Sequence, residues 1–262
     1  MTPAFDVLTL HPAMVAACLH ASVLGRAVER GLVHIGVHDI RDAGIGRHRT
    51  VDDAPFGGGA GMVMRVDVVA HALQALRRVD SHVILTSPGG RRFDQSVAHE
   101  LAARPHTILV CGHYEGIDAR VEELVDEQLS IGDFVLTGGE IAAAAIVDAA
   151  ARLVPGVLGN EASAGDESFA SGLLEYPHYT RPRVWEGREV PEVLVSGHHG
   201  KVEAWRLAQA KARTRARRPD LWAAWCAREG IEVGAPIPGV DPTPEAPRRR
   251  RRRRVDEPGP VQ

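Results

Sequence analysis

Apolar and polar positions along the first 151 residues alternate between a two-residue period and a helical period. Short runs typical of buried strands end in polar or glycine-rich turns, at residues 1–10, 32–40, 82–86, 107–111 and 129–136. Between them, apolar residues three or four positions apart predict helices over residues 12–31, 66–79, 93–103, 117–126 and 141–151. Strands that alternate with helices in this way predict an α/β fold, with a parallel sheet and helices on both faces.

The pattern changes after residue 172. Prolines stiffen residues 177–191, and residues 201–218 contain seven basic residues and a single acid, which predicts a basic helix or a helix pair. Residues 219–230 predict one more short helix. The last segment, residues 236–262, is rich in proline and includes the seven-arginine run Arg248–Arg254. Such a composition cannot bury a core, so we expect this segment to be disordered.

These changes predict four parts along the chain. They are an α/β domain at residues 1–160, an interdomain linker at 161–172, a small C-terminal helical domain at 173–235 and a tail at 236–262. The basic residues gather in the third part, near Tyr179 and His198. A charge run is usually a solvated face, but its position beside these rings favours a surface that contacts phosphates.

Composition excludes several classes of protein. The chain has 262 residues, 44% of them hydrophobic and 25% charged, with a net charge of −3, all ordinary for a globular protein. No apolar run approaches the ~20 residues of a membrane span, so we expect no membrane association. The first ten residues lack a basic region and contain Asp6, unlike a secretory signal. Three scattered cysteines favour reduced thiols in a cytoplasmic protein.

Three of the predicted strands end in turns that carry glycine or polar side chains. They are Ser87-Pro88, the stretch from Gly112 to Glu115, and the stretch from Ser130 to Gly139. Ligands bind at the carboxyl ends of strands in open parallel sheets, and glycine lets backbone approach a ligand closely. The three turns therefore predict one binding site, although each could also be an ordinary strand-to-helix turn.

A long polar segment, residues 41–61, separates the predicted strand at residues 32–40 from the predicted helix at residues 66–79. Its charges of both signs suit either a solvated surface loop or a loop that faces RNA or a ligand. The glycine run at residues 57–61 is not a dinucleotide fingerprint, because no strand precedes it and the last glycine of that pattern is missing.

Several longer motifs follow one another in a fixed order over roughly residues 1–220. They are Asp52–Met62, Ser87-Pro88, Val110–Val121, Ser130–Glu140, Pro155–Gly159 and Pro177–Pro182. In sequence and in order, these motifs resemble the bacterial tRNA (guanine-N1)-methyltransferases of the TrmD family, which are SPOUT methyltransferases. Because the motifs are long and ordered, the resemblance is far more specific than any one of them.

The resemblance implies a fold and a cofactor. The fold is a SPOUT-type parallel sheet with a deep trefoil knot, an exception to the rule that chains are unknotted, plus a small C-terminal helical domain. The knot loops of this family bind S-adenosylmethionine in a bent form. By resemblance, the cofactor-binding residues here are Leu85, Thr86, Ser87, Pro88, Gly112, His113, Tyr114, Glu115, Gly116, Ser130, Ile131, Gly132, Phe134, Leu136, Gly138 and Gly139.

The resemblance also implies the catalytic groups. Methylating guanine N1 requires a base that removes its proton and a cation that stabilises the charge on O6. Arg152 matches the family's arginine near the guanine; without the resemblance it would be an ordinary charge at a helix end. The family usually has Asp-Ser-Phe in its linker, with the aspartate as base. Here Glu167 stands at that position without a gap and Asp166 precedes it, so both are candidates.

Partners follow from the same resemblance. Family members are obligate homodimers with the active site between subunits. They methylate the guanosine 3′ of the anticodon of tRNA (position 37) and use weakly bound Mg²⁺, for which the sequence contains no dedicated cage. Two other functions stay open: methylation of a different RNA site, or RNA binding without catalysis. The presence of the linker acids, Arg152 and residues 177–182 favours the tRNA enzyme.

Overall fold

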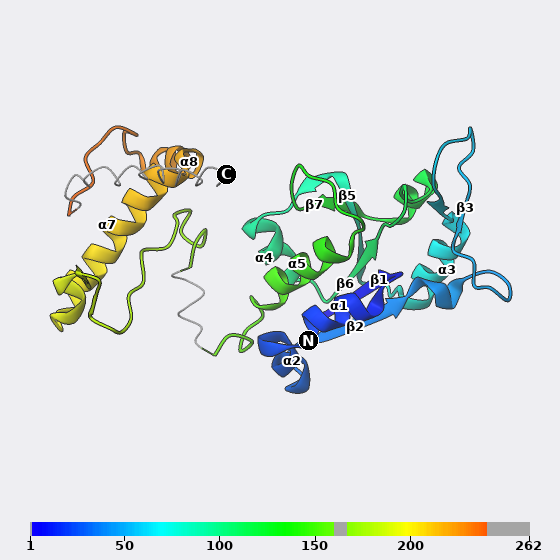
Figure 1. Cartoon of the computed structure of the whole chain (residues 1–262), viewed down its shortest axis with the longest axis horizontal. Coiled ribbons are helices and arrows are strands. Elements are labelled where there is room, and N and C mark those ends of the chain that lie inside the picture. The colour runs from blue at the N-terminus through cyan, green and yellow to red at the C-terminus, as the bar shows by residue number, and fades with distance from the viewer. Residues whose placement is uncertain (1, 160–166, 240–262) are drawn as a thin grey trace, which may run out of the picture. The chain divides into compact units, whose positions relative to one another are not determined.

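The computed structural model describes residues 2–159 and 167–239 (Figure 1). It divides into two compact units, Met1–Gly165 and Asp166–Gln262, which we describe separately. Among the described residues, no helix is both long enough and apolar enough to cross a membrane.

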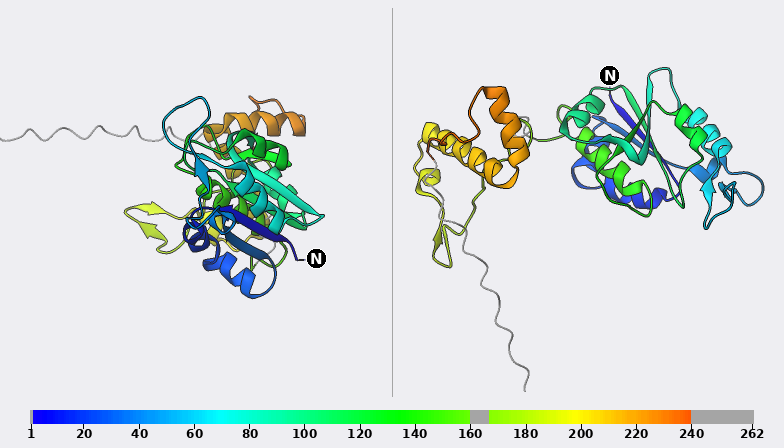
Figure 2. Two further views of the ribbon diagram at one scale, coloured as in Figure 1. Left: turned by 90° about the vertical axis from the view of Figure 1, so that its right-hand side faces the viewer. Right: turned by 90° about the horizontal axis from the view of Figure 1, so that it is seen from above.

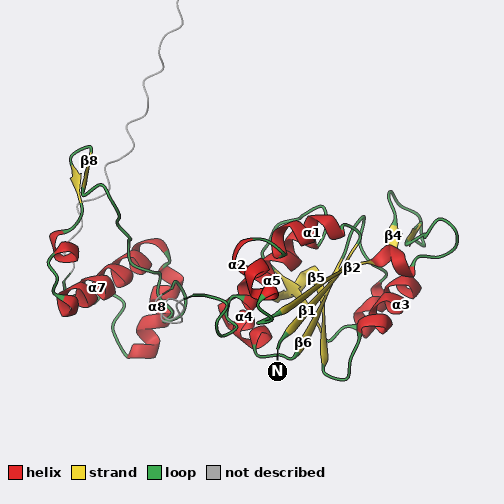
Figure 3. Ribbon diagram, turned by 90° about the horizontal axis from the view of Figure 1, so that it is seen from below, coloured by secondary structure: helices red, strands yellow, loops and turns green. Residues whose placement is uncertain are grey.

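The first unit is built on a five-stranded parallel sheet. Its strands are β1 (Ala4–Thr9), β2 (His34–Asp39), β5 (Ser81–Arg92), β6 (His106–Cys111) and β7 (Glu127–Ser130). They lie in the order β2-β1-β6-β5-β7, and every neighbouring pair is parallel (Figure 3). The parallel α/β sheet predicted from the sequence is thereby confirmed.

Helices cover both faces of this sheet (Figures 2 and 3). Four of them, α1 (Pro12–Leu19), α2 (Ser22–Glu29), α4 (Gln95–Ala102) and α5 (Glu140–Ala151), pack on one face, and α3 (Val66–Leu76) packs on the other. Alternating side chains of each strand serve the two faces: in β1, Phe5 and Val7 join the first core and Leu8 the second. This alternation explains why the strands read as almost continuous apolar runs.

Two predicted helices differ from the structure. Residues 12–31 form the two helices α1 and α2, because the chain turns sharply at Ser22, where φ is +54°. Residues 117–126 form only a 3₁₀ helix, η2 (Ala119–Leu124). Asp118 caps its first turn through the Arg120 N–H, and Val121 is its one buried residue, so no apolar face supports a longer α-helix.

Two strands also have unexpected lengths. The predicted strand at residues 129–136 ends early, since β7 stops at Ser130 and the chain leaves the sheet at Gly132, where φ is +150°. The apolar side chains that follow are exposed, 54% for Phe134 and 87% for Val135. Strand β5 instead runs on to Arg92, past an irregularity between Thr86 and Arg91.

Short elements complete the first unit. A 3₁₀ helix, η1 (Ile40–Ala43), follows β2, and the long polar segment after it holds one antiparallel pair, β3 (Asp52–Asp53) with β4 (Val63–Met64). The end of this segment is joined to the turn after β6. The Glu115 N–H donates to the Met62 carbonyl (3.1 Å) and the Met64 N–H to the Gly116 carbonyl (3.0 Å).

The second unit contains two main helices, α7 (His199–Arg217) and α8 (Pro219–Glu229). The basic segment thus forms a single helix rather than a pair. Within residues 167–239 it also contains β8 (Val184–Trp185), β9 (Arg188–Glu189) and a 3₁₀ helix, η3 (Glu192–Val195). A small buried core holds Leu173, Ala210, Trp222, Trp225 and Cys226, and the two indole rings stack with centroids 5.3 Å apart.

Candidate functional site

A pocket of about 310 Å³ lies at the carboxyl ends of β6 and β7 and beside residues 85–88 of β5, where that strand becomes irregular. All three sequence-predicted turns line it, and so does each of the sixteen residues named above as cofactor contacts. Further lining residues that the sequence did not single out are Ile117, Asp118, Glu122, Gln128, Leu129, Val135, Thr137 and Ala142. Most of these residues lie within or next to the predicted turns in the sequence. That proximity could have been used to predict them. The cofactor-binding role of the lining residues remains a prediction.

Backbone hydrogen bonds join the turn after β6 to the turn before α5. The Gly139 N–H donates to the Gly112 carbonyl (2.8 Å), and His113 and Gly138 form a single antiparallel bridge. Within β5, just before its irregular part, the Thr86 hydroxyl donates to the Val110 carbonyl (3.1 Å). Hydrogen-bonded backbone therefore holds this part of the pocket wall in place.

Gly139 is the tightest point of that wall. A Cβ added there would overlap the Thr86 hydroxyl and lie 3.0 Å from the Cys111 Cα. At the neighbouring Gly138, a Cβ would overlap the Glu140 carboxylate. Gly139 also faces backbone atoms of Cys111 and Gly112, which is the close backbone approach that the Gly-Gly pair predicted.

Charge at the rim and base of the pocket is set by local contacts. At the rim, hydrogen bonds from the Arg120 side chain and N–H lower the pKa of Asp118 to about 2, so that carboxyl is ionised at neutral pH. At the base, burial together with the nearby Glu140 carboxylate raises the pKa of the Cys111 thiol well above its usual value. Cys111 is therefore a neutral packing residue and not a nucleophile.

The predicted catalytic residues lie outside the three turns. Arg152 is half-buried and forms the C-cap of α5, where its N–H donates to the Asp148 carbonyl (3.2 Å). Glu167 is half-buried at the start of the described part of the second unit, and its carbonyl accepts from the Ala170 N–H (3.2 Å). Asp166 lies outside the described residues. The catalytic roles stay predictions.

The residues present do not form a magnesium cage. Within residues 2–159 and 167–239, one group of three acidic, histidine or cysteine side chains could hold a metal ion: His11, His113 and Glu140. Two imidazoles and one carboxylate are a nitrogen-rich set, whereas Mg²⁺ prefers six oxygens. We therefore assign no step to magnesium.

A parallel sheet whose strand ends enclose a glycine-walled pocket defines an α/β protein with a small-molecule site at its carboxyl edge. The particular family follows from sequence comparison. The model of the tRNA (Guanine-1)-methyltransferase TrmD family matches residues 3–224, and the chain belongs to this family.

Individual relatives are similar over most of their lengths. The tRNA (guanine-N(1)-)-methyltransferase of Chloroflexus aggregans is 58% identical over 223 residues, covering 84% of this chain and 87% of the relative. The protein of the same name from Desulforudis audaxviator is 58% identical over 219 residues, 82% of this chain and 88% of the relative. That of Gluconobacter oxydans is 53% identical over 228 residues, 86% of this chain and 97% of the relative.

Proposed function

We propose that the protein transfers a methyl group from S-adenosylmethionine to N1 of a tRNA guanosine, the one 3′ of the anticodon at position 37. The observation that carries this proposal is the pocket: the three turns that the family uses for its cofactor all line it, in a chain that belongs to the family. Its volume is within the range of small-molecule sites.

The pocket residues fit the proposed cofactor. The glycines at 138 and 139 keep the wall free of side chains, and exposed backbone groups of residues 112–116 and 130–139 can bind polar parts of a nucleoside. Apolar side chains of the same wall, such as Leu85 and Ile131, suit the adenine ring. S-adenosylmethionine, when bound, supplies an electrophilic methyl group.

The chain's own residues supply the remaining chemistry. Guanine N1 is a weak acid, so a carboxylate removes its proton efficiently only if the charge on O6 is stabilised at the same time. Glu167 is our candidate for the base, with Asp166 as the other, and Arg152 for the cation that stabilises O6. Glu167 is favoured because it matches the family's aspartate without a gap. Its side chain is one methylene longer than that aspartate.

The finer architecture belongs to the same proposal. We infer that the residues around β5, β6 and β7 are threaded as the trefoil knot of SPOUT enzymes. We also infer that residues 173–235 form a separate tRNA-binding domain, joined by the linker, and that the active site forms between the subunits of a homodimer. The exposed basic residues Lys201, Arg215 and Arg217 of α7 support the tRNA role of that domain. With tRNA as substrate, we expect the protein in the cytoplasm.

The test uses the purified full chain, methyl-labelled S-adenosylmethionine and two tRNA transcripts that differ only at position 37, guanosine or adenosine. Digestion to nucleosides should give labelled 1-methylguanosine from the first transcript and none from the second. Label in another nucleoside, or label retained with adenosine at 37, would indicate a different RNA site. Tight tRNA binding without any label would indicate a non-catalytic RNA-binding protein.

A further inference from the structure

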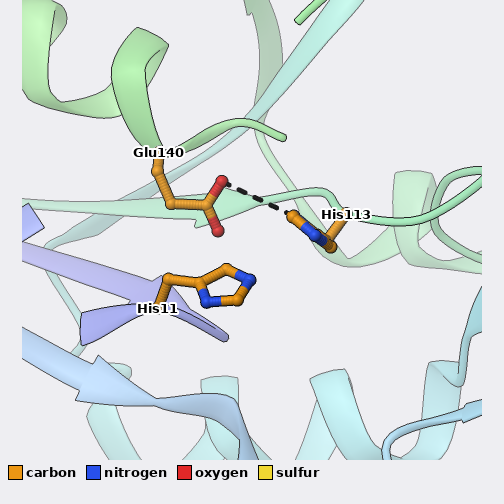
Figure 4. A group of neighbouring side chains, drawn as sticks. All are labelled: His11, His113 and Glu140. Atoms are coloured by element: carbon orange, nitrogen blue, oxygen red, sulfur yellow. Dashed lines mark ion pairs between the residues drawn. The ribbon is translucent and has the colours of Figure 1, made fainter. Parts of the chain in front are cut away.

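We propose that His11, His113 and Glu140 form a binding site for a divalent transition-metal ion, with Zn²⁺ as its first candidate. The three side chains come from the segment after β1, the turn after β6 and the first residue of α5 (Figure 4). Their ligand atoms all lie within 4.8 Å of one another. The inference does not depend on the methyltransferase activity proposed above.

The geometry is close to that of a metal site. His113 Nδ1 lies 3.8 Å from Glu140 Oε2, which is too long for a hydrogen bond. In a tetrahedral zinc site with bonds of about 2.0–2.1 Å, two ligand atoms are separated by about 3.3 Å. Small side-chain rotations would therefore bring this pair to coordination distance. His11 is exposed, so its ring can move and an ion can reach the site from solvent.

Burial and hydrogen bonding point to a cation at this place. Glu140 is only 3% exposed, and the Thr9 hydroxyl donates to its Oε1 at 2.9 Å, while its Oε2 faces His113. His113 Nδ1 is buried and, among the described residues, has no hydrogen-bond partner. A buried carboxylate facing an unpaired imidazole nitrogen is costly, and a bound divalent cation would satisfy both groups.

Neighbouring groups hold the three ligands in place. The Thr9 hydroxyl donates to Glu140 and also accepts from the backbone N–H of His11 at 2.9 Å, so one buried side chain orients the carboxylate and fixes the backbone of His11. The His113 ring lies edge-on to two other rings. Its centroid is 4.7 Å from that of the His11 ring and 5.1 Å from that of the Tyr114 ring. Outer contacts that orient the ligands in this way are characteristic of metal centres.

The ligand chemistry selects the class of metal. Two neutral imidazoles and one carboxylate suit Zn²⁺, Co²⁺ or Fe²⁺, and leave a coordination position open. His113 also lines the pocket, so a bound ion would fix the turn at residues 112–116 in one position.

The test measures metal binding directly. The full chain, without a histidine tag and stripped with a chelator, is titrated with Zn²⁺ against a chromophoric competitor in the absence of S-adenosylmethionine. Replacing a group that merely orients ligands lowers metal affinity about 10- to 100-fold, so His11→Gln and His113→Gln should each lower it at least about 100-fold. Thr9→Val should lower it about 10-fold.

Matched variants separate this site from chance binding. His71 is an exposed histidine on α3, and His71→Gln should leave the affinity unchanged within about twofold. His11 is exposed, so His11→Gln should fold normally, as checked by its melting temperature, even if Glu140→Gln does not. Co²⁺ should show a visible spectrum of nitrogen and oxygen ligands, lost in His11→Gln.

Three results would overturn the proposal. The first is equal Zn²⁺ affinity of the wild type, His11→Gln and His113→Gln. The second is a thiolate charge-transfer band with Co²⁺, which would place the ion on a cysteine such as the exposed Cys18. The third is loss of binding only on replacing the adjacent pair His198 and His199, which would place it on α7.

Discussion

The two units use their residues in opposite ways. In the first, hydrogen-bonded backbone forms much of the pocket wall, and a Cβ at Gly139 would overlap the Thr86 hydroxyl and crowd the backbone of Cys111. In the second, a core of a few buried residues supports a helix that exposes Lys201, Arg215 and Arg217. Cofactor binding in the first unit should therefore fail abruptly on single substitutions, whereas tRNA binding by the basic helix of the second should decline by small steps.

The largest effect is expected at Gly139. Gly139→Val should abolish S-adenosylmethionine binding measured by calorimetry, because the added atoms overlap Thr86 and press on Cys111. Gly159→Val is the matched control, since a Cβ at Gly159 meets nothing within 4 Å. Both variants should stay folded, as checked by their melting temperatures. Unchanged affinity in folded Gly139→Val would remove this turn from the cofactor site.

The next effect concerns catalysis and joins the two units. Glu167→Gln and Arg152→Ala should each lower the methylation rate by on the order of 10²-fold or more. Because the base and the cation act on one developing charge, the double variant should be little slower than the poorer single variant. Asp166→Asn should be milder. A severe Asp166→Asn with a benign Glu167→Gln would move the base to Asp166.

Mixing the two single variants tests whether the subunits share a site. If base and arginine come from different subunits, a heterodimer of Glu167→Gln and Arg152→Ala has one site with both defects and one with neither. Activity should then partly return, while mixing either variant with itself restores nothing. Confirmed heterodimers without recovery would mean that both groups act within one chain.

A buried carboxylate in the first unit should matter for stability. Asp6 is 3% exposed and accepts hydrogen bonds from His38 and His106, both at 2.7 Å. Burial alone would raise the pKa of Asp6, but these two histidines outweigh it and hold the pKa below its usual value. The stabilisation is therefore complete above pH of about 5 and is lost as the pH falls below about 4.

Asp6→Asn should accordingly lower the free energy of unfolding by roughly 2–4 kcal/mol at neutral pH. Its difference from wild type should shrink in denaturant titrations below pH of about 4. The control lies in the second unit, where Arg218 lowers the pKa of the exposed Asp220 to about 2. Asp220→Asn should leave the melting temperature unchanged, because exposed ion pairs contribute little. Equal losses in both variants would contradict the contrast between the units.

A smaller effect is expected on α7. Arg217→Ala should weaken tRNA binding a few-fold at moderate salt and reduce the slope of log affinity against log salt by about 1, as for one lost phosphate contact. Arg26→Ala, an exposed arginine on α2, is the control and should change neither. A loss of affinity that is independent of salt would indicate a packing role for Arg217.

The smallest effect is expected from the tail. Deleting residues 240–262 should leave turnover on tRNA largely intact at moderate salt, with at most a weaker association whose loss depends on salt. Turnover and cofactor affinity measured side by side provide the check. A collapse in turnover with unchanged cofactor affinity would make the arginine run part of the active RNA interface.

Much of the fold could be predicted, because apolar residues repeat with one period in strands and with another in helices. Two of the errors arose where one residue overrides that period: Ser22 divides a helix, and Gly132 turns an apolar run out of the sheet. The three pocket turns could be predicted because parallel strands share one carboxyl edge. The approach of His11 to His113 could not, since it requires knowing that β1 lies beside β6.

The location of the tryptophans, including the stacked pair Trp222 and Trp225, has a spectroscopic consequence. All four tryptophans, Trp185, Trp205, Trp222 and Trp225, belong to the second unit, so intrinsic tryptophan emission monitors that unit alone. Far-ultraviolet circular dichroism, by contrast, monitors the helices of both. Denaturant curves recorded by the two signals would coincide if the chain unfolds as one cooperative body and separate if each unit melts by itself. The protein thus carries a natural label for one of its halves.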